Sequence, residues 1–216
     1  MPANMKLYSW YRSSSAWRVR IGMAYKGISH ETVSVNLIQG EGEQHSAAFH
    51  VKNPMEQIPV LELDDGSFRL PQSVAILEFL EELYPAPPLL PRDMRLRARV
   101  RQFVEIINSG IQPLQNLKLQ QILTARGVDF TPLVQGFIET GLRALETTAA
   151  ASAGTYLVGD HVTLADVYLI PQLYQSRLRG VDVEKFPLLR RVELACEQLP
   201  AFQAAHPNSQ PDRPPT

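Results

Sequence analysis

The sequence predicts an α/β domain followed by an all-helical domain. Strand and helix patterns alternate over residues 5–84, whereas helical periodicity alone continues from residue 93 onward. Between these regions, residues 84–92 (Tyr-Pro-Ala-Pro-Pro-Leu-Leu-Pro-Arg) hold four prolines, which neither a helix nor a central strand accommodates. We therefore place the first domain at residues 1–84, a linker at 85–92 and the second domain at 93–216.

The pattern of the first domain predicts a βαβ half followed by a ββα half, which suits a small mixed sheet covered by helices. The expected strands are 6–10, 31–36, 59–63 and 67–70. The expected helices are 16–26, 45–52 and 73–84. The dipeptide Asp65-Gly66, preceded by Asp64, marks the turn of a hairpin between the last two strands.

The second domain shows long helical patterns up to about residue 202. Val134, Ile138, Leu142 and Leu145, for example, recur on one helical face, which we expect to be buried. The tail from residue 207 to 216 holds four prolines and few apolar residues, so we expect a surface extension and not a folded unit.

The composition excludes several classes of function. The 216 residues carry a formal net charge of -1 without a long basic run, so neither nucleic acid nor a membrane surface is the expected partner. No apolar stretch reaches the roughly 18 residues of a membrane span, and no apolar leader opens the chain; we expect a soluble, cytoplasmic protein. The five histidines are scattered and the single cysteine, Cys196, lies in a buried helical pattern, so no metal site is expected.

Three serines, Ser13, Ser14 and Ser15, stand where the first strand leads into the first helix. The N-terminus of a helix has unpaired N–H groups and a partial positive charge, which suit hydroxyls that cap the helix or help to hold an anion. A thiolate is such an anion, and a hydroxyl that donates to the sulfur favours its charged form. From this stretch alone, both roles stay open.

Two further segments of the first domain offer ligand contacts. A cis Ile58–Pro59 bond would leave the N–H and C=O of Ile58 to pair with an extended, peptide-like ligand, although Pro59 can also simply shape the start of its strand. Gln72 and Ser73 open another helix and suit a carboxylate, although Ser73 would serve equally well as a plain N-cap. Glutathione combines a thiol, a peptide backbone and a carboxylate in one short ligand.

Several segments resemble, in chain order, those of the zeta-class glutathione transferases, the maleylacetoacetate isomerases. The most specific are Arg-Ser-Ser at 12–14 and Gly-Ile-Gln-Pro-Leu-Gln-Asn-Leu at 110–117. They are accompanied by Asn-Pro-Met-Glu-Gln-Ile-Pro at 53–59, Gln-Ser-Val-Ala-Ile at 72–76 and Leu-Ala-Asp-Val-Tyr-Leu-Ile-Pro-Gln at 164–172. The resemblance covers nearly the whole chain. It implies a thioredoxin-like N-terminal domain with an all-helical C-terminal domain, the glutathione transferase fold, in a homodimer.

The resemblance also implies a role for individual residues toward glutathione. Ser13 would donate to the glutathione sulfur, with Ser14 beside it. Gln44 and the backbone of Ile58, before Pro59, would hold the glycine and cysteine parts. Gln72 with Ser73 would hold the γ-glutamyl end. Thr163 and Asp166 match the family's capping box, which is structural.

The implied activity is the glutathione-dependent cis–trans isomerisation of maleylacetoacetate, a step of tyrosine and phenylalanine catabolism. A thiolate that adds reversibly to the cis double bond leaves a single bond about which rotation is easy. Such an enzyme must also stabilise the developing enolate, for which Ser15 or Gln112 are candidates, and fix the substrate carboxylates, for which Arg12 and Arg177 are candidates. The substrate is expected to be a small dicarboxylic or keto acid.

Two departures from the family pattern keep other functions open. Ser15 replaces the usual cysteine, which weakens a dehalogenating function more than an isomerising one. Leu178 replaces an arginine that many relatives have, with Arg177 as the best substitute. The alternatives are a maleylpyruvate isomerase, a glutathione-conjugating or dehalogenating transferase, and a non-catalytic binding protein. The intact serine turn argues against the last, because binding alone does not need thiol activation.

Overall fold

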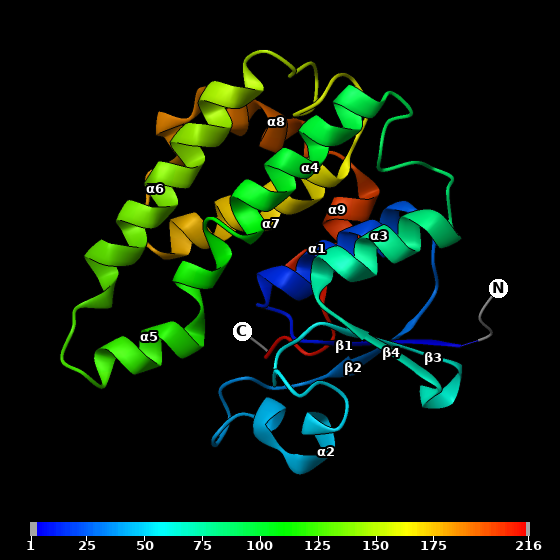
Figure 1. Cartoon of the computed structure of the whole chain (residues 1–216), viewed down its shortest axis with the longest axis vertical. Coiled ribbons are helices and arrows are strands. Elements are labelled where there is room, and N and C mark those ends of the chain that lie inside the picture. Colours follow the sequence, from blue (N-terminus) through cyan, green and yellow to red (C-terminus); the bar gives the residue numbers. More distant parts are fainter. Residues whose placement is uncertain (1–3, 215–216) are drawn as a thin grey trace. The chain divides into compact units, whose positions relative to one another are not determined.

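The computed structural model describes residues 4–214, which form two compact units (Figure 1). Unit 1 comprises the described residues up to Pro88 together with those from Leu199 onward, and unit 2 comprises Leu89–Gln198. The predicted division at 84 and 93 therefore falls close to the observed one, but the C-terminal segment belongs to unit 1 and not to the helical domain.

The sheet of unit 1 has four strands in the order β2-β1-β3-β4. Their bounds are β1 Met5–Ser9, β2 Glu31–Ser34, β3 Val60–Leu63 and β4 Phe68–Pro71. Strand β1 pairs in parallel with β2 and antiparallel with β3, and β3 pairs antiparallel with β4. This is the mixed sheet expected from a βαβ half followed by a ββα half.

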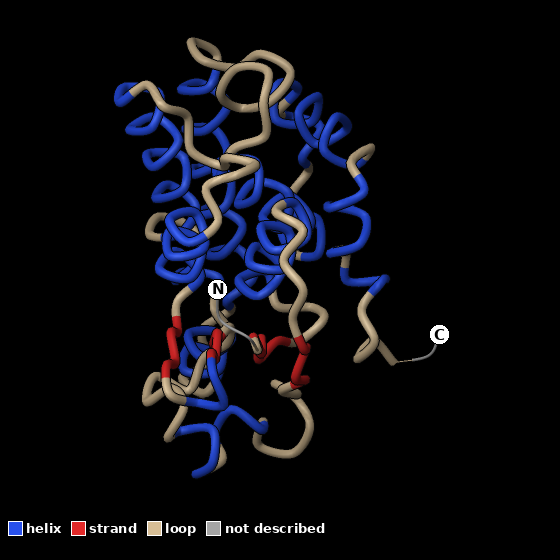
Figure 2. The backbone as a smooth tube through the Cα atoms, turned by 90° about the vertical axis from the view of Figure 1, so that its right-hand side faces the viewer, coloured by secondary structure: helices blue, strands red, loops and turns tan. Residues whose placement is uncertain are grey.

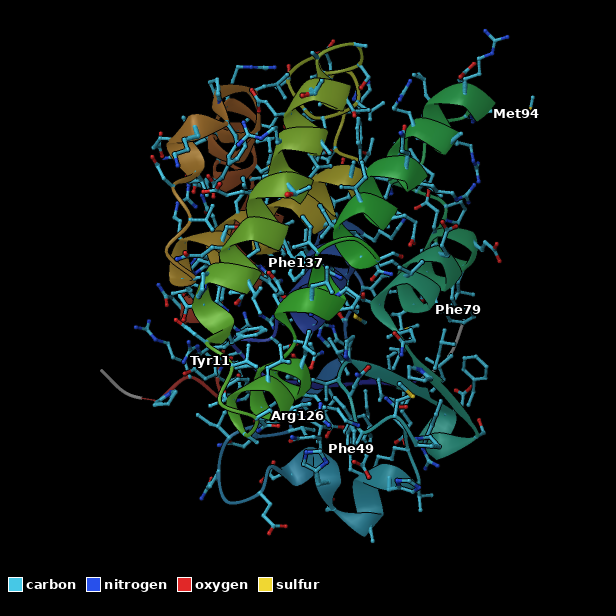
Figure 3. All side chains as sticks on the ribbon, turned by 60° about the vertical axis from the view of Figure 1, so that its left-hand side comes forward. Tyr11, Phe49, Phe79, Met94, Arg126 and Phe137 are labelled. Atoms are coloured by element: carbon cyan, nitrogen blue, oxygen red, sulfur yellow. The ribbon has the colours of Figure 1, made fainter. Side chains whose placement is uncertain are left out.

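Helices cover both faces of this sheet (Figure 1). Helices α1 (Ser14–Tyr25), α3 (Ser73–Leu83) and α9 (Pro200–Ala205) lie on one side, where α1 packs against both α3 and α9. The short helix α2 (Ala47–His50) lies on the other side. There Phe49 points toward the strands (Figure 3), and its ring meets that of Tyr8 edge to face at 6.2 Å. Phe49 thereby closes a small core that includes Trp10 and Val60.

The proline-rich linker is divided between the two units because each half is held locally. In unit 1, the buried Lys26 Nζ donates to the carbonyls of Tyr84 and Pro87 at 2.7 and 2.9 Å and pairs with Glu81 at 2.6 Å. In unit 2, Leu89 is fully buried and its carbonyl accepts the N–H of Leu164 at 2.9 Å. Buried contacts therefore set the boundary, whereas the prolines only restrict the backbone around it.

The described part of the C-terminal tail belongs to unit 1, so its predicted placement in the second domain at 93–216 is wrong. Helix α9 leads into a 3₁₀ turn, η5 (Pro207–Ser209), whose first residue is buried. The ring of His206 meets that of Trp17 edge to face at 5.2 Å. The predicted end of the tail, residues 215–216, lies outside the described residues.

Unit 2 is built from helices, as expected. Among the described residues, the strands drawn in Figure 2 all belong to unit 1. The helices of unit 2 are α4 (Met94–Asn108), α5 (Leu117–Thr124), α6 (Phe130–Ala149), α7 (Leu164–Leu178) and α8 (Pro187–Glu197). The described residues also form the 3₁₀ turns η1 (Glu43–His45), η2 (Asp64–Gly66), η3 (Gln112–Gln115) and η4 (Val183–Lys185).

The predicted apolar faces of unit 2 are confirmed. Val134, Ile138, Leu142 and Leu145 of α6 are all buried, as is Cys196 of α8. The predicted capping box is present at the start of α7, where Thr163 and Asp166 exchange hydrogen bonds. None of the described helices combines the length and the apolar character that crossing a membrane would require.

Candidate active site

The strand register brings three of the predicted segments to one edge of the sheet in unit 1. Val60 pairs with Tyr8 on one side and with Pro71 on the other. The end of β1, the start of β3 and the end of β4 therefore lie side by side. The serine turn (residues 12–15) follows β1, Ile58–Pro59 precedes β3, and Gln72 with Ser73 follows β4. These residues are widely separated in the sequence.

The serine turn joins β1 to the N-terminus of α1. Ser13 is the N-cap residue, and its Oγ accepts the backbone N–H of Ala16 at 3.2 Å. The N–H of Ser13 in turn donates to the carbonyl of Trp10 at 3.0 Å, which closes the turn. Ser14 is buried and Ser15 is half-buried. The capping role left open by the sequence is thus present, and it still allows the hydroxyl hydrogen of Ser13 to be donated to an anion.

The charges around this turn favour an anion. Helix α1 has 12 residues and no acidic side chain in its first turn, so its N-terminal N–H groups keep their partial positive charge. Two buried arginines of the same helix, Arg18 and Arg20, add positive charge behind the turn, and the charge of Arg20 is partly balanced by Asp212. Such surroundings lower the pKa of a thiol placed at the turn.

Ile58 and Pro59 are joined by a cis peptide bond, as hypothesised from the sequence. Within residues 4–214, the N–H and the C=O of Ile58 have no hydrogen-bond partner. Asn53, which is 1% exposed, fixes the approach to this bond: its Nδ2 donates to the carbonyl of Gln57 at 2.6 Å and its Oδ1 accepts the N–H of Met55 at 3.0 Å. Asn53 was not among the predicted site residues, although Asn before Pro is a turn signal that could have pointed to it.

Gln72 and Ser73 begin α3 at the same edge of the sheet. Gln72 is the residue before the helix and has a positive φ of 76°. Ser73 is 4% exposed, and the guanidinium of Arg18 approaches its Oγ at 3.5 Å. A buried cation therefore lies next to the helix start that was predicted to hold a carboxylate.

Gln44 lies in η1, within the segment that follows β2. It is 6% exposed, and its Nε2 donates to the carbonyl of Leu37 at 3.5 Å. Its side chain lies directly against Gly42, where the φ of 92° favours glycine and a Cβ would displace the amide of Gln44. Among the described residues, no group donates to the buried Gln44 Oε1. A buried acceptor without a donor costs about 1–3 kcal/mol, which a ligand N–H would relieve.

The remaining candidates were predicted to contact substrate. Arg12 is exposed in the serine turn of unit 1. Gln112 lies in η3 of unit 2, where its Oε1 accepts Gln115 Nε2 at 3.5 Å. Arg177 lies in α7 of unit 2 and forms two hydrogen bonds of 2.6 Å with the carboxylate of Glu193. These hydrogen bonds raise the pKa of Arg177. The structure thus gives Arg177 a protein partner where the sequence predicted a substrate carboxylate.

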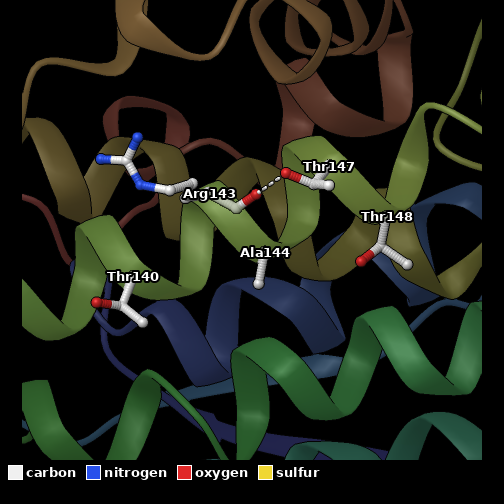
Figure 4. A pocket seen from close by; sticks show the side chains of 5 residues that line it. All are labelled: Thr140, Arg143, Ala144, Thr147 and Thr148. Carbon is white, nitrogen blue, oxygen red and sulfur yellow. Dashed lines mark hydrogen bonds between the residues drawn. The ribbon is translucent and has the colours of Figure 1, made fainter.

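Unit 2 also has a surface depression, but the predicted site residues do not line it. An open depression of about 400 Å³ lies along α6 and is lined by Thr140, Arg143, Ala144, Thr147 and Thr148 (Figure 4). The hydroxyl of Thr147 donates to the carbonyl of Arg143 within the helix, and none of the predicted site residues lines the depression. In the part of the chain that is described, no three His, Cys, Asp or Glu side chains are grouped to hold a metal ion.

Comparisons with known proteins agree with this geometry. Residues 7–88 match the family model of the glutathione S-transferase N-terminal domain, and residues 133–208 match that of the C-terminal domain. The maleylacetoacetate isomerase of Rattus norvegicus is 46% identical over 209 residues, which cover 96% of this chain and 94% of the rat protein. The chain belongs to the zeta class of the glutathione S-transferases.

Two solved structures support this assignment to the zeta class. A maleylacetoacetate isomerase from Anaeromyxobacter dehalogenans 2CP-1, with GSH bound in its active site, is 50% identical to this zeta-class transferase. The match covers 98% of both chains with a TM-score of 0.90. A bacterial maleylpyruvate isomerase described as zeta class is 38% identical, with a TM-score of 0.89 and a coverage of 96% of this chain and 99% of that one.

Proposed function

We propose that this zeta-class transferase catalyses the glutathione-dependent cis–trans isomerisation of maleylacetoacetate to fumarylacetoacetate. The observation that carries the proposal is the convergence of the Ser13 turn, Ile58 and Ser73 at one edge of the sheet. The identities of 46% and 50% to proteins named maleylacetoacetate isomerase support the choice of substrate. In that case the enzyme serves tyrosine and phenylalanine catabolism.

The residues of unit 1 fit glutathione. The unpaired N–H and C=O of Ile58 suit the cysteinyl backbone, because an extended peptide pairs through these two groups. Ser73 and Gln72, at the start of α3 and beside Arg18, suit the γ-glutamyl carboxylate. Gln44, with its buried Oε1, suits the glycyl end. Pro59 fixes the backbone direction that presents Ile58.

When bound, glutathione supplies a thiolate for reversible addition to the double bond of the substrate. Ser13 donates its hydroxyl hydrogen to the sulfur, and the N-terminus of α1 stabilises the negative charge. Ser14, buried directly after Ser13, belongs to the same turn. Ser15 and Gln112 are our candidates for stabilising the developing enolate. Arg12 is our first candidate for the substrate carboxylate, because it directly precedes Ser13 in the same turn.

Maleylpyruvate is the second candidate substrate, because the similar bacterial structure is named a maleylpyruvate isomerase. The two substrates need the same thiolate chemistry and differ in their carboxylate end. Conjugation of glutathione to other acceptors uses the same thiolate, whereas dehalogenation is less favoured because position 15 is a serine and not a cysteine.

We further propose that the protein is a cytoplasmic homodimer. An exposed aromatic side chain in unit 1 supports a second copy as partner: Phe68 is 42% exposed and packs on the partly buried Phe79 of α3 with ring centroids 5.6 Å apart. Exposed aromatic side chains of this kind are enriched at interfaces. The balanced net charge of -1 supports a soluble protein that does not depend on a membrane surface.

The test is the isomerisation of maleylacetone, a simple analogue, with and without glutathione, by the parent protein and by Ser13→Ala. We expect turnover that requires catalytic glutathione and that falls at least about tenfold in the variant. A parallel assay with maleylpyruvate decides between the two substrates by their kcat/KM values. Retention on immobilised glutathione without turnover of either substrate would instead favour a non-catalytic binding protein.

A further inference from the structure

The carboxylate of Asp212 binds the turn that precedes Ser13. Its Oδ2 accepts the backbone N–H of Tyr11 at 2.9 Å, across 201 residues of sequence, and the hydroxyl of Ser34 at 3.2 Å. A hydrogen bond from a peptide N–H to a carboxylate is stronger than one between neutral groups. This hydrogen bond therefore joins the C-terminal segment to the backbone of Tyr11, two residues before the proposed catalytic residue Ser13.

Arg20 holds the same turn from the carbonyl side. This arginine is 3% exposed, and its guanidinium donates to the carbonyls of Trp10 and Tyr11 at 3.3 and 3.1 Å and to Ser9 Oγ at 2.9 Å. Burial lowers the pKa of Arg20 to about 10, which leaves it charged at neutral pH, and the charge of Asp212 opposes that decrease. Tyr11 is thus held at its N–H by an anion and at its C=O by a cation.

The C-terminal segment is ordered enough to position Asp212. Arg20 Nε donates to the carbonyl of Ala205 at 3.2 Å, which ties the end of α9 to α1. Gln210 Nε2 donates to the carbonyls of Ala204 and His206 at 2.9 and 3.0 Å, and the N–H of Arg213 donates to the carbonyl of Gln210 at 3.2 Å. These bonds fold the chain into a turn that directs Asp212 toward Tyr11.

We propose that Asp212 is a positioning residue for thiol activation: it orients the serine turn through the N–H of Tyr11, so that Ser13 faces the glutathione sulfur. The proposal rests on the function proposed above. Ser13 depends on the turn because its own N–H donates to the carbonyl of Trp10, which Arg20 also contacts. Gln44 and Ser73 lie on other segments, so loss of Asp212 affects thiol ionisation more than glutathione binding.

The experiment compares Asp212→Ala with Asp212→Asn and with Ser34→Ala. The asparagine variant keeps an oxygen acceptor for Tyr11, and the Ser34 variant removes only the second hydrogen bond of Asp212. The readouts are the pKa of bound glutathione, from the ultraviolet absorbance of its thiolate, together with kcat and the KM for glutathione. We expect Asp212→Ala to raise that pKa by about one unit and to lower kcat by about five- to tenfold, with KM changed less than about twofold.

The matched variants decide how these changes are interpreted. Asp212→Asn is expected to recover most of kcat and of the thiol pKa, and Ser34→Ala is expected to match the parent protein. An unchanged thiol pKa and kcat in Asp212→Ala would overturn the proposal, as would equal impairment of the alanine and asparagine variants. A decrease in kcat that merely follows the folded fraction, measured by circular dichroism, would also overturn it.

A glutathione-free measurement separates this proposal from the proposed function. Amide hydrogen exchange at Tyr11 and Ser13 is expected to accelerate at least about tenfold in Asp212→Ala, because their protection depends on the held turn. A parent protein that does not lower the pKa of bound glutathione would contradict the proposed function, and the exchange data would still decide the role of Asp212. Unchanged exchange would show that Asp212 does not hold the turn.

Discussion

The hydroxyl oxygen of Ser13 accepts the backbone N–H of Ala16 at 3.2 Å, so the residue proposed to serve the thiol also caps helix α1. The two roles are compatible because a hydroxyl can accept one hydrogen bond while it donates another. The cap in fact fixes the oxygen at the helix N-terminus, where the partial positive charge is strongest.

Ser13→Ala therefore has two separable consequences. Loss of the cap is expected to lower the free energy of unfolding by about 1 kcal/mol. Loss of the hydrogen bond to a charged sulfur is expected to lower kcat/KM at least about tenfold. Urea unfolding and the maleylacetone assay measure the two effects.

Asp93→Ala is the matched control for this variant. Asp93 caps α4 by accepting the N–H groups of Arg95 and Leu96, both at 2.9 Å, and lies outside the candidate site. It should lose a similar amount of stability and keep its activity. An equal loss of activity in both variants would mean that the effect of Ser13→Ala is one of folding.

Arg177→Met tests whether Arg177 serves the fold or the substrate. The side chain of its partner Glu193 is 3% exposed, and among residues 4–214 it would then pair with Arg190 alone, at 2.9 Å. We expect a loss of about 1–2 kcal/mol in the free energy of unfolding, less than for a fully buried pair because Arg177 is more than a third exposed. The KM for maleylpyruvate, which carries a carboxylate at each end, should change less than about twofold. A large rise in KM at unchanged stability would instead support the predicted carboxylate clamp.

Asp166→Ala is expected to be the most destabilising of these substitutions. Asp166 is fully buried, and its carboxylate accepts the N–H groups of Leu157 and Thr163 at 2.9 and 2.8 Å and the Thr163 hydroxyl at 3.0 Å. Removing it leaves two buried N–H groups without a partner, which should cost about 3 kcal/mol. Asp160→Ala is the control, since Asp160 makes a similar pair of bonds to Thr155 at an exposed site and should matter less.

Glu56 gives unit 1 a dependence on pH. Its carboxylate accepts His45 Nδ1 at 2.7 Å and His50 Nδ1 at 3.1 Å, and these hydrogen bonds lower the pKa of Glu56 below its ordinary value of 4.5. Because the folded state has the lower pKa, the stabilisation is complete above the unfolded value and disappears as the pH falls through the folded one.

The difference in the free energy of unfolding between the parent protein and Glu56→Gln should therefore shrink as the pH falls below about 4.5. Denaturant unfolding at several pH values measures it. Glu41→Gln, at an exposed position of the same segment, should show no such difference. A difference that grows on acidification would contradict the lowered pKa of Glu56.

Features specified by a few neighbouring residues could be predicted from the sequence. The four strands and the helices α1, α2 and α3 of unit 1, the capping box at Thr163 and Asp166, and the buried face of α6 all follow from local patterns, and each was found. The cis bond before Pro59 was one of two alternatives that the sequence left open, because a proline at the start of a strand is compatible with either isomer.

The partners of charged side chains could not be predicted in this way. Arg177 was expected to meet a substrate, but it pairs with Glu193, 16 residues away on the next long helix of unit 2. Its neighbours in sequence say nothing about this contact, because a long flexible side chain can reach many positions. Only the packing of α7 against α8 brings the two groups to 2.6 Å.

The sequence by itself determined the family, the two kinds of domain and the segments that carry the candidate site, because motifs and periodicity are local properties. Only the tertiary structure decided that the C-terminal segment returns to unit 1 and places Asp212 on the N–H of Tyr11. Its prolines predicted an extension, since they exclude regular structure, but a segment without regular structure can still be held by side-chain hydrogen bonds. A contact across 201 residues depends on the whole fold of the unit, and no local pattern records it.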